Sequence, residues 1–198
     1  EWVKLALEYD FVLLNDECYS ELYCDEKPVS LLEASLHVNN DSFKNVLVIN
    51  SISKRSSAPG LRSGFIAGDE NILKEYMKYR TYVGAATPLP LQCASAAAWS
   101  DEKHVESARV VYKKNLELAS EILGVKRSDA TFYVWLEVED ELEFTKALFE
   151  KKNVKVLPGS FLGREGIGRA YVRIALVENN KKTKEVLMRI KDFIKEIS

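Results

Sequence analysis

Histidine and cysteine are scarce in this sequence, with two and three residues respectively. The cysteines, Cys18, Cys24 and Cys93, are odd in number and lack the paired spacing of a metal site. Reduced thiols in a cytoplasmic protein fit this pattern, because disulfides persist only in oxidising compartments. No partner motif stands beside His37 or His104, so neither a histidine-based triad nor a metal site is expected.

The chain also lacks an excess of either charge and any long apolar run. Its 28 basic and 30 acidic residues give a net charge of −2, with no basic block to attract nucleic acid or a membrane surface. We find no stretch that resembles a secretory signal and no apolar run of bilayer-crossing length. A hydrophobic content of 46% suffices for a packed core, and 198 residues suffice for one large domain or two small ones.

Two apolar runs predict strands whose carboxyl ends carry polar side chains. Residues 11–14 (Phe-Val-Leu-Leu) precede Asp16 and Tyr19, and residues 46–49 (Val-Leu-Val-Ile) precede Lys54. Continuous apolar runs are typical of parallel strands that are buried on both faces. Ligands of open α/β sheets bind at the carboxyl ends of the strands. We therefore expect an acid, a phenol and an amine at one edge of a sheet.

The stretch around Lys54 admits three interpretations. The lysine could hold a phosphate as a point charge, attack a carbonyl as a nucleophile, or be a solvated residue of a surface turn. A Walker-type phosphate loop is excluded, because its glycines precede the lysine and here they follow it. The hydroxyls of Ser51 and Ser53 stand just before Lys54, and Arg62 follows it by eight residues.

The remaining pattern predicts two groups of elements. In the first group we expect a helix at 1–9 with Trp2, Leu5 and Tyr9 on one face, an antiparallel or edge strand at 63–68, helices at 70–82 and 91–99 around a break at 84–90, and a helix at 101–123. In the second group we expect strands at 131–138, 154–157 and 170–176, helices at 141–151 and 181–197, and a glycine-rich loop at 158–168. Trp99 and Trp135 are interpreted as core residues.

The polar residues of the predicted edge match the needs of pyridoxal phosphate. The aldehyde of this cofactor requires a lysine, its pyridine nitrogen requires a carboxylate, and its 3-oxygen requires a donor such as a phenol. Its phosphate requires hydroxyls and a guanidinium, which binds such groups in a bidentate way. Asp16, Tyr19, Lys54 and Arg62 can each meet one of these needs.

Five motifs resemble those of fold-type I pyridoxal-phosphate-dependent aminotransferases of class I/II. They are Asp-Glu-Cys-Tyr at 16–19, Ser-Ile-Ser-Lys at 51–54, Gly-Leu-Arg-Ser-Gly at 60–64, Pro-Gly-Ser-Phe at 158–161 and Tyr-Val-Arg-Ile at 171–174. The resemblance implies an α/β fold. Residues 1–110 would form the C-terminal part of the large domain, a mixed, mostly parallel sheet with helices, and residues 111–198 a small α+β domain. The N-terminal half of the family fold is expected to be absent, and without it the chain should bind the cofactor poorly.

The same resemblance implies roles for the residues of the site. Lys54 would form the Schiff base and shuttle a proton at the substrate α-carbon, Asp16 would pair with the pyridinium nitrogen, and Tyr19 would hydrogen-bond the 3-oxygen. Cys18 would pack near the ring without a chemical role.

Phosphate and substrate binding are assigned by resemblance as well. Ser51 and Arg62 would bind the phosphate of the cofactor, and Ser53 is a weaker candidate for the same task. Arg173 would bind the substrate α-carboxylate, since an arginine within a strand is costly to bury without a partner.

The implied function is transfer of an amino group between an amino acid and a 2-oxo acid, in a cytoplasmic homodimer of amino-acid biosynthesis. Residues 87–92 (Thr-Pro-Leu-Pro-Leu-Gln) resemble succinyldiaminopimelate aminotransferases, with aspartate and aromatic enzymes close behind, and a dicarboxylic or glutamate-linked reaction is favoured. Two alternatives stay open: a C–S β-lyase or synthase on the same fold, and a non-catalytic cofactor-sensing domain of a transcription regulator. No nucleic acid, membrane or metal partner is expected.

Overall fold

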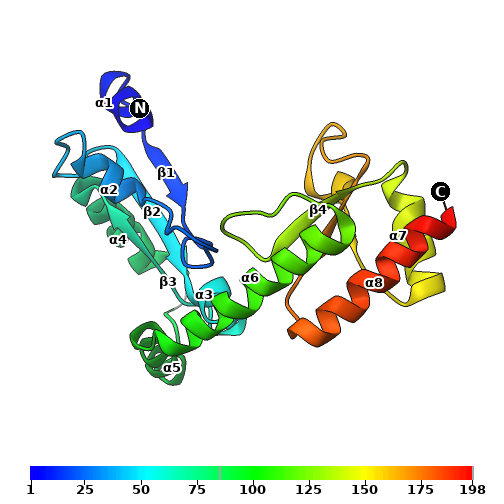
Figure 1. Cartoon of the computed structure of the whole chain (residues 1–198). Coiled ribbons are helices and arrows are strands. Elements are labelled where there is room, and N and C mark those ends of the chain that lie inside the picture. The colour runs from blue at the N-terminus through cyan, green and yellow to red at the C-terminus, as the bar shows by residue number, and fades with distance from the viewer. Residues whose placement is uncertain (85, 198) are drawn as a thin grey trace. The chain divides into compact units, whose positions relative to one another are not determined.

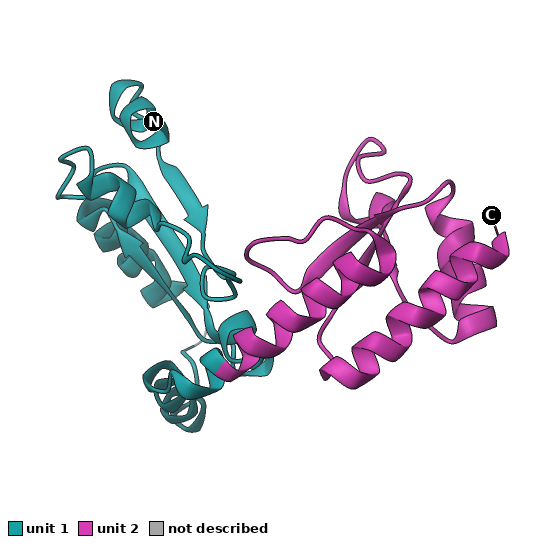
Figure 2. Ribbon diagram, in the orientation of Figure 1, with its two compact units in different colours: residues 1–106 teal, residues 107–198 magenta. Residues whose placement is uncertain are grey.

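The computed structural model describes residues 1–84 and 86–197. These residues form two compact units, unit 1 at Glu1–Glu106 and unit 2 at Ser107–Ser198 (Figure 2). Each unit is built around its own three-stranded sheet with helices packed beside it (Figure 1). The mixed α/β class predicted from the sequence is confirmed, whereas the assignment of residues 1–110 and 111–198 to a large and a small domain stays a prediction.

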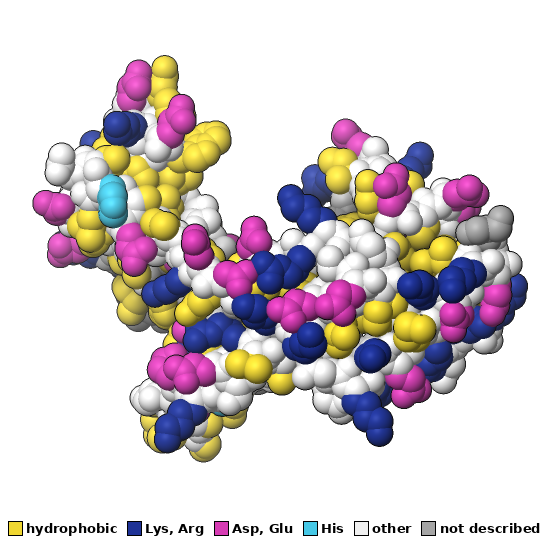
Figure 3. Space-filling view, viewed as in Figure 1, with side chains coloured by type: hydrophobic (Ala, Val, Ile, Leu, Met, Phe, Trp, Pro, Cys, Tyr) yellow, Lys and Arg dark blue, Asp and Glu magenta, His cyan; other side chains and the backbone are white. Residues whose placement is uncertain are grey.

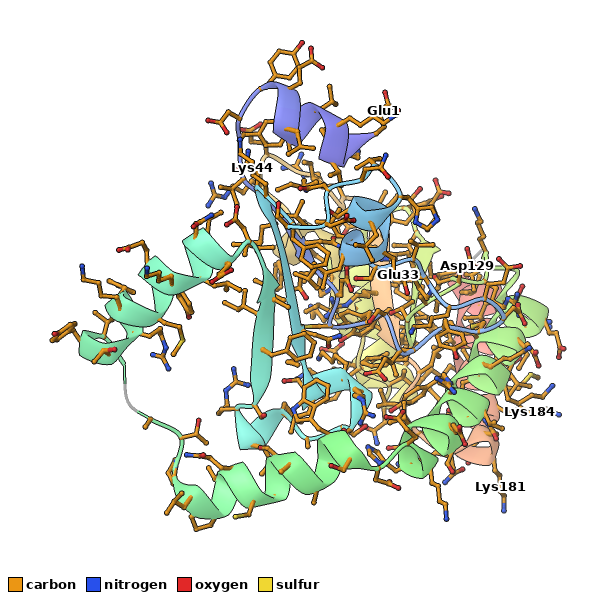
Figure 4. The ribbon with its side chains drawn as sticks, turned by 90° about the vertical axis from the view of Figure 1, so that its left-hand side faces the viewer. Glu1, Glu33, Lys44, Asp129, Lys181 and Lys184 are labelled. Atoms are coloured by element: carbon orange, nitrogen blue, oxygen red, sulfur yellow. The ribbon has the colours of Figure 1, made fainter. Side chains whose placement is uncertain are left out.

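Unit 1 alternates helices and strands along the chain. Its elements are α1 (Trp2–Glu8), β1 (Leu13–Asp16), α2 (Leu31–Leu36), β2 (Val46–Ser51), α3 (Ile52–Arg55), η1 (Pro59–Leu61), β3 (Gly64–Gly68), α4 (Glu70–Tyr82), α5 (Leu89–Ser100) and the first turn of α6 (Lys103–Leu123). A capping box starts α2, with Ser30 as the N-cap and Glu33, labelled in Figure 4, as its partner.

The sheet of unit 1 has the order β1-β2-β3. β1 runs parallel to β2, with Asp16 opposite Ile49, and β3 runs antiparallel to β2, with Gly64 opposite Ser51. Alternate residues of β2 are buried, and the residues between them are half-buried. The carboxyl ends of β1 and β2 therefore meet the start of β3 at one edge.

Unit 2 is the α+β unit that the sequence predicts. It contains the rest of α6, β4 (Tyr133–Glu137), α7 (Glu141–Lys152), β5 (Leu157–Pro158), η2 (Gly159–Leu162), β6 (Tyr171–Ala175) and α8 (Asn180–Ile197). Its three strands pair antiparallel in the order β4-β6-β5. The buried amide of Asn115 on α6 donates to the carbonyl oxygens of Leu176 and Glu178, which fixes the helix to the end of β6.

Several predicted elements differ from the structure at the N-terminus. The strand predicted at 11–14 lies at Leu13–Asp16, and it is not buried on both faces, because Val12 and Leu14 are more than half exposed. β1 pairs only with β2 within the described residues, so it is an edge strand. The first helix buries Val3 and Ala6, and the predicted face of Trp2 and Tyr9 is exposed instead.

Three further predictions need correction. The break predicted at 84–90 is shorter, because Pro90 stands in the first turn of α5, where a missing N–H costs nothing; Ala85 lies outside the described residues. Of the strand predicted at 154–157, only Leu157 lies in a strand, and Pro158, which was predicted to be in the loop, is the other residue of that strand. Trp135 is not core, because alternation along β4 leaves it 44% exposed, and Trp99 is half-buried.

Candidate functional site

The predicted site residues of unit 1 gather at the edge where β1 and β2 end. Asp16 is the last residue of β1, and Ser51 is the last residue of β2. Because the two strands are parallel, their carboxyl ends lie at the same edge of the sheet. Lys54 follows on α3, three residues beyond the end of β2 and within the short helix that begins at Ile52.

The Asp16 side chain is exposed and forms a hydrogen bond with the backbone of a nearby residue of the same turn. Its Oδ1 accepts a hydrogen bond from the backbone N–H of Cys18 at 3.0 Å. Hydrogen bonds from Cys18, first from the thiol and then from this N–H, hold the pKa of Asp16 below its ordinary value. The carboxyl group is therefore ionised at neutral pH, as pairing with a protonated ring requires.

Cys18 lies between Asp16 and the end of β2. Its Sγ is 3.4 Å from the hydroxyl oxygen of Ser51. Burial raises the pKa of the Cys18 thiol, and the neighbouring Asp16 carboxylate adds to the shift. A neutral thiol is a poor nucleophile, so the position of Cys18 favours a packing contact over a chemical role.

Lys54 lies beside the aromatic ring of Tyr19. The Lys54 Nζ is 5.9 Å from the centroid of that ring, within the range of a cation–π contact. Tyr19 belongs to the turn after β1, where its carbonyl oxygen accepts from the N–H of Leu22. The amine and the phenol, 35 residues apart in the sequence, are thus neighbours in the fold.

Ser51, Ser53 and Arg62 share one hollow of about 440 Å³. The hydroxyl oxygen of Ser51 accepts the N–H of Ser53 at 3.4 Å and caps α3. Arg62 is exposed, has a left-handed backbone with φ of 50°, and donates to the carbonyl oxygen of Pro59 at 2.8 Å. Two hydroxyls and a guanidinium in one hollow form a donor set for a phosphate.

Arg173 lies in unit 2, on β6. Its side chain is half-buried, and its guanidinium carbon is 4.1 Å from the centroid of the Tyr133 ring. The stacked guanidinium lies on the same face of the sheet as Trp135, its partner in the β4–β6 register. Its role toward a substrate carboxylate stays a prediction.

The structure contains a histidine network that the sequence analysis did not expect. His104 Nδ1 is 2.5 Å from the Asp101 carboxylate, and its Nε2 is 2.9 Å from the Ser56 hydroxyl. The chain of acid, imidazole and hydroxyl resembles a nucleophilic triad. However, the N–H of Ser56 bonds to carbonyl oxygens of α3, so it cannot stabilise an oxyanion there. We interpret the network as a structural link between α3 and the start of α6.

Arg55 is a second feature that sequence reasoning missed. It follows Lys54 directly, and its side chain is only 2% exposed. No spacing in the sequence distinguishes it from a surface arginine, because its partners, Glu21 and Glu102, are distant along the chain.

The described residues offer no metal centre and no membrane helix. No group of three His, Cys, Asp or Glu side chains within residues 1–84 and 86–197 is placed to hold a metal ion. None of the described helices combines the length and the apolar character that crossing a bilayer requires.

Comparison with known proteins gives one consistent result. The sequence profile of a family described as aminotransferase class I and II matches residues 1–190. The chain is 33% identical over 195 residues to the 4-dedimethylamino-4-oxo-anhydrotetracycline transaminase OxyQ of Streptomyces rimosus, covering 96% of this chain and 53% of that protein. It is 33% identical over 202 residues to an LL-diaminopimelate aminotransferase of Natranaerobius thermophilus, covering 96% and 50%.

A solved structure agrees with these relatives. The aminotransferase AspB of Helicobacter pylori matches with a TM-score of 0.93 and 48% identity, over 97% of this chain and 52% of that one. The chain therefore spans about half the length of the relatives it matches.

Proposed function

Because the chain belongs to the aminotransferase class I and II family, whose members depend on pyridoxal phosphate, we propose that it supplies the cofactor lysine of an aminotransferase. The reaction moves an amino group between an amino acid and a 2-oxo acid. The observation that carries the proposal is the position of the Lys54 amine beside the Tyr19 ring, at the sheet edge where Asp16 ends β1.

The residues at this edge fit the cofactor by their chemistry. Lys54 would hold the aldehyde, Asp16 the pyridine nitrogen and Tyr19 the 3-oxygen. The phosphate would occupy the hollow of Ser51, Ser53 and Arg62, since hydroxyls and a guanidinium are its usual donors. Bound pyridoxal phosphate supplies an electrophilic aldehyde and a ring that draws electrons from the substrate α-carbon.

Each side chain has a defined task in the proposed reaction. Lys54 would hold the cofactor and would shuttle a proton between the substrate α-carbon and the aldehyde carbon of the cofactor. The ionised Asp16 keeps the ring nitrogen protonated, which the lowered pKa of its carboxyl favours. Arg173 binds the α-carboxylate and orients the substrate, because a guanidinium matches a carboxylate in bidentate geometry.

The substrate is proposed from the relatives and from residues 87–92. A relative named LL-diaminopimelate aminotransferase and another named aspartate aminotransferase, from Pyrococcus abyssi, support a dicarboxylic amino acid with glutamate as the amino donor. Succinyldiaminopimelate belongs to the same chemical class. A homodimer and a place in amino-acid biosynthesis are parts of this proposal.

The test follows the absorbance of pyridoxal phosphate bound to the protein at its natural length. Glutamate, aspartate and diaminopimelate are added singly, and then a 2-oxo acid is added. We expect the band of the aldehyde form to disappear with the amino acid and to return with the oxo acid. Pyruvate and ammonia released from a cysteine conjugate, without turnover of oxo acids, would instead indicate a β-lyase.

Lys54→Ala provides the matched variant. Loss of the amine should lower the rate of amino-group transfer by about a thousandfold or more, because a positioned general base contributes on the order of 10²–10⁴. Lys44→Ala, at an exposed lysine just before β2 (labelled in Figure 4), should leave the rate unchanged. Equal rates for Lys54→Ala and the unmodified protein would refute the assignment of Lys54.

A further inference from the structure

Arg55 is a buried charge placed directly after the cofactor lysine. It ends α3, a helix of only four residues, and its side chain is 2% exposed. Removal of a guanidinium from water is costly unless partners satisfy its charge and its donors. The partners of Arg55 therefore indicate what the residue does.

Two carboxylates, a carbonyl oxygen and an aromatic ring from different parts of unit 1 meet at this guanidinium. Its Nε is 2.7 Å from a carboxylate oxygen of Glu21, and its Nη2 forms an ion pair with Glu102. Its Nη1 donates to the carbonyl oxygen of Ala98 at 2.8 Å. Its guanidinium carbon is 5.3 Å from the centroid of the Trp99 ring. Arg55 thus fastens α3 to the end of α5 and to the segment that begins α6. Figure 1 shows these three elements close together.

The contact with Glu21 joins the two halves of the cofactor site. Glu21 lies two residues after Tyr19, in the turn that follows β1, while Arg55 lies one residue after Lys54. The Arg55 side chain therefore connects the turn that contains Tyr19 to the helix that contains Lys54. The bond between His104 and Ser56 adds a second link from α3 to the start of α6.

We propose that Arg55 is a positioning residue, which sets the place of Lys54 relative to Tyr19 by tying both of their backbone segments to α5. The inference rests on the proposed function. Arg55 acts through its neighbours and does not touch the cofactor. Because a displacement of about 1 Å in an active site can cost on the order of a hundredfold in rate, loosening this tie should weaken the capture of the cofactor by Lys54.

The experiment measures where and how fast pyridoxal phosphate reacts with lysines of the cofactor-free protein at its natural length. Samples are quenched with borohydride over time, and mass spectrometry quantifies the phosphopyridoxyl group on each lysine. Lys44 and Lys114, which are exposed, serve as internal standards in every sample. General loss of stability would change labelling at all lysines, whereas a positioning defect changes the ratio of Lys54 to these standards.

Arg55→Met keeps the aliphatic stem and removes the charge. We expect the labelling rate of Lys54, relative to Lys44 and Lys114, to fall at least tenfold, because misplacement of a reacting group lowers reaction rates by such factors. Arg55→Lys should restore part of it, because an ammonium can reach one carboxylate but cannot satisfy both at once. Arg189→Met, which removes an ion pair with Glu185 in unit 2, should leave the ratio unchanged.

The outcomes separate this inference from the proposed function. No preference for Lys54 in the unmodified protein would overturn both. A preference that survives unchanged in Arg55→Met would overturn the positioning role alone. If Arg55→Met does not fold, Glu21→Gln tests the inference instead, because it removes only the carboxylate charge in the turn that contains Tyr19. A lower Lys54 ratio in Glu21→Gln supports the inference, and an unchanged ratio contradicts it.

Discussion

A single buried carboxylate, Asp69, fixes the junction between β3 and α4. One of its oxygens accepts the N–H groups of Asn71 and Ile72, which would lack partners in the first turn of the helix. The other oxygen accepts the N–H of Asn45 at 2.7 Å, just before β2. The bond from Asn45, followed by those from the helix, lowers the pKa of Asp69 below its ordinary value.

We predict that Asp69→Asn destabilises the protein by about 1–3 kcal/mol, because the amide that replaces one oxygen cannot accept the N–H of Asn45. Asp140→Asn is the matched control. Asp140 caps α7 but is exposed, and it accepts only the first N–H groups of that helix. Asparagine caps helices as well as aspartate does, so this change should cost a few tenths of a kcal/mol. Denaturant unfolding measures both.

The difference in the free energy of unfolding between the unmodified protein and Asp69→Asn should depend on pH. The pKa of Asp69 is lower in the folded state than the value of about 3.9 of an unfolded aspartate. Its contribution to stability is therefore complete above that value and is lost as the pH falls through the folded pKa. If this difference in unfolding free energy stayed constant down to the lowest pH at which the protein folds, the result would argue against an ionised Asp69.

Among single residues, spacing after apolar runs predicted that Asp16, Tyr19 and Lys54 lie at one edge of a sheet, and the structure places Lys54 beside Tyr19. The roles of these residues toward a cofactor stay predictions. Arg55 and His104 were missed because their partners stand more than 30 residues away or across a turn, where neither periodicity nor spacing marks a pair.

Among the elements, the antiparallel pair of β2 and β3 depends on close backbone contact at its end. Gly68 pairs with Leu47 and has a φ of 139°, which side chains rarely allow. A Cβ atom there would lie 2.0 Å from the carbonyl oxygen of Val46, and neither backbone can yield without loss of the ladder.

Gly68→Ala should therefore destabilise the protein by roughly 2–4 kcal/mol, the sum of backbone strain and a clash in a packed region. Gly60→Ala is the control, since a Cβ atom at that position meets nothing within 4 Å. It should be neutral or stabilise by up to about 1 kcal/mol. Thermal unfolding of both variants tests the prediction, and equal midpoints would contradict it.

The long helices were more predictable than the bounds of the strands for a physical reason, whereas the short helices α2 and α3 were not predicted. α4 occupies the predicted residues 70–82 because Asp69 and an amphipathic period define it locally. The strand at 11–14 was misplaced because an apolar run looks the same whether its faces are covered or open. Which face of β1 is buried depends on residues far along the chain, and no local pattern carries that information.

On the scale of the whole chain, several large apolar side chains of unit 1 are exposed, and exposed apolar patches are typical of surfaces that associate. Figure 3 shows hydrophobic side chains gathered near its N-terminal end. Trp2, Tyr9, Val12 and Leu14 are each more than half exposed.

We predict that the 198-residue chain, produced alone, associates as its concentration rises, because burial of this surface is favourable. Lysine at both Val12 and Leu14 should reduce association, as judged by sedimentation velocity. The same change at Val110 and Ile167, single apolar residues that are each 71% exposed, should have little effect. A monomer at all concentrations would contradict the prediction.

The central claim is that one amine at the edge of this sheet holds an aldehyde cofactor whose ring nitrogen meets Asp16. A crystal structure of the protein at its natural length, grown with pyridoxal phosphate, tests it most directly. We expect continuous density from Lys54 Nζ to the cofactor, with the Asp16 carboxylate in hydrogen-bonding distance of the ring nitrogen. A cofactor linked to another lysine, or a ring nitrogen out of reach of Asp16, would contradict the account.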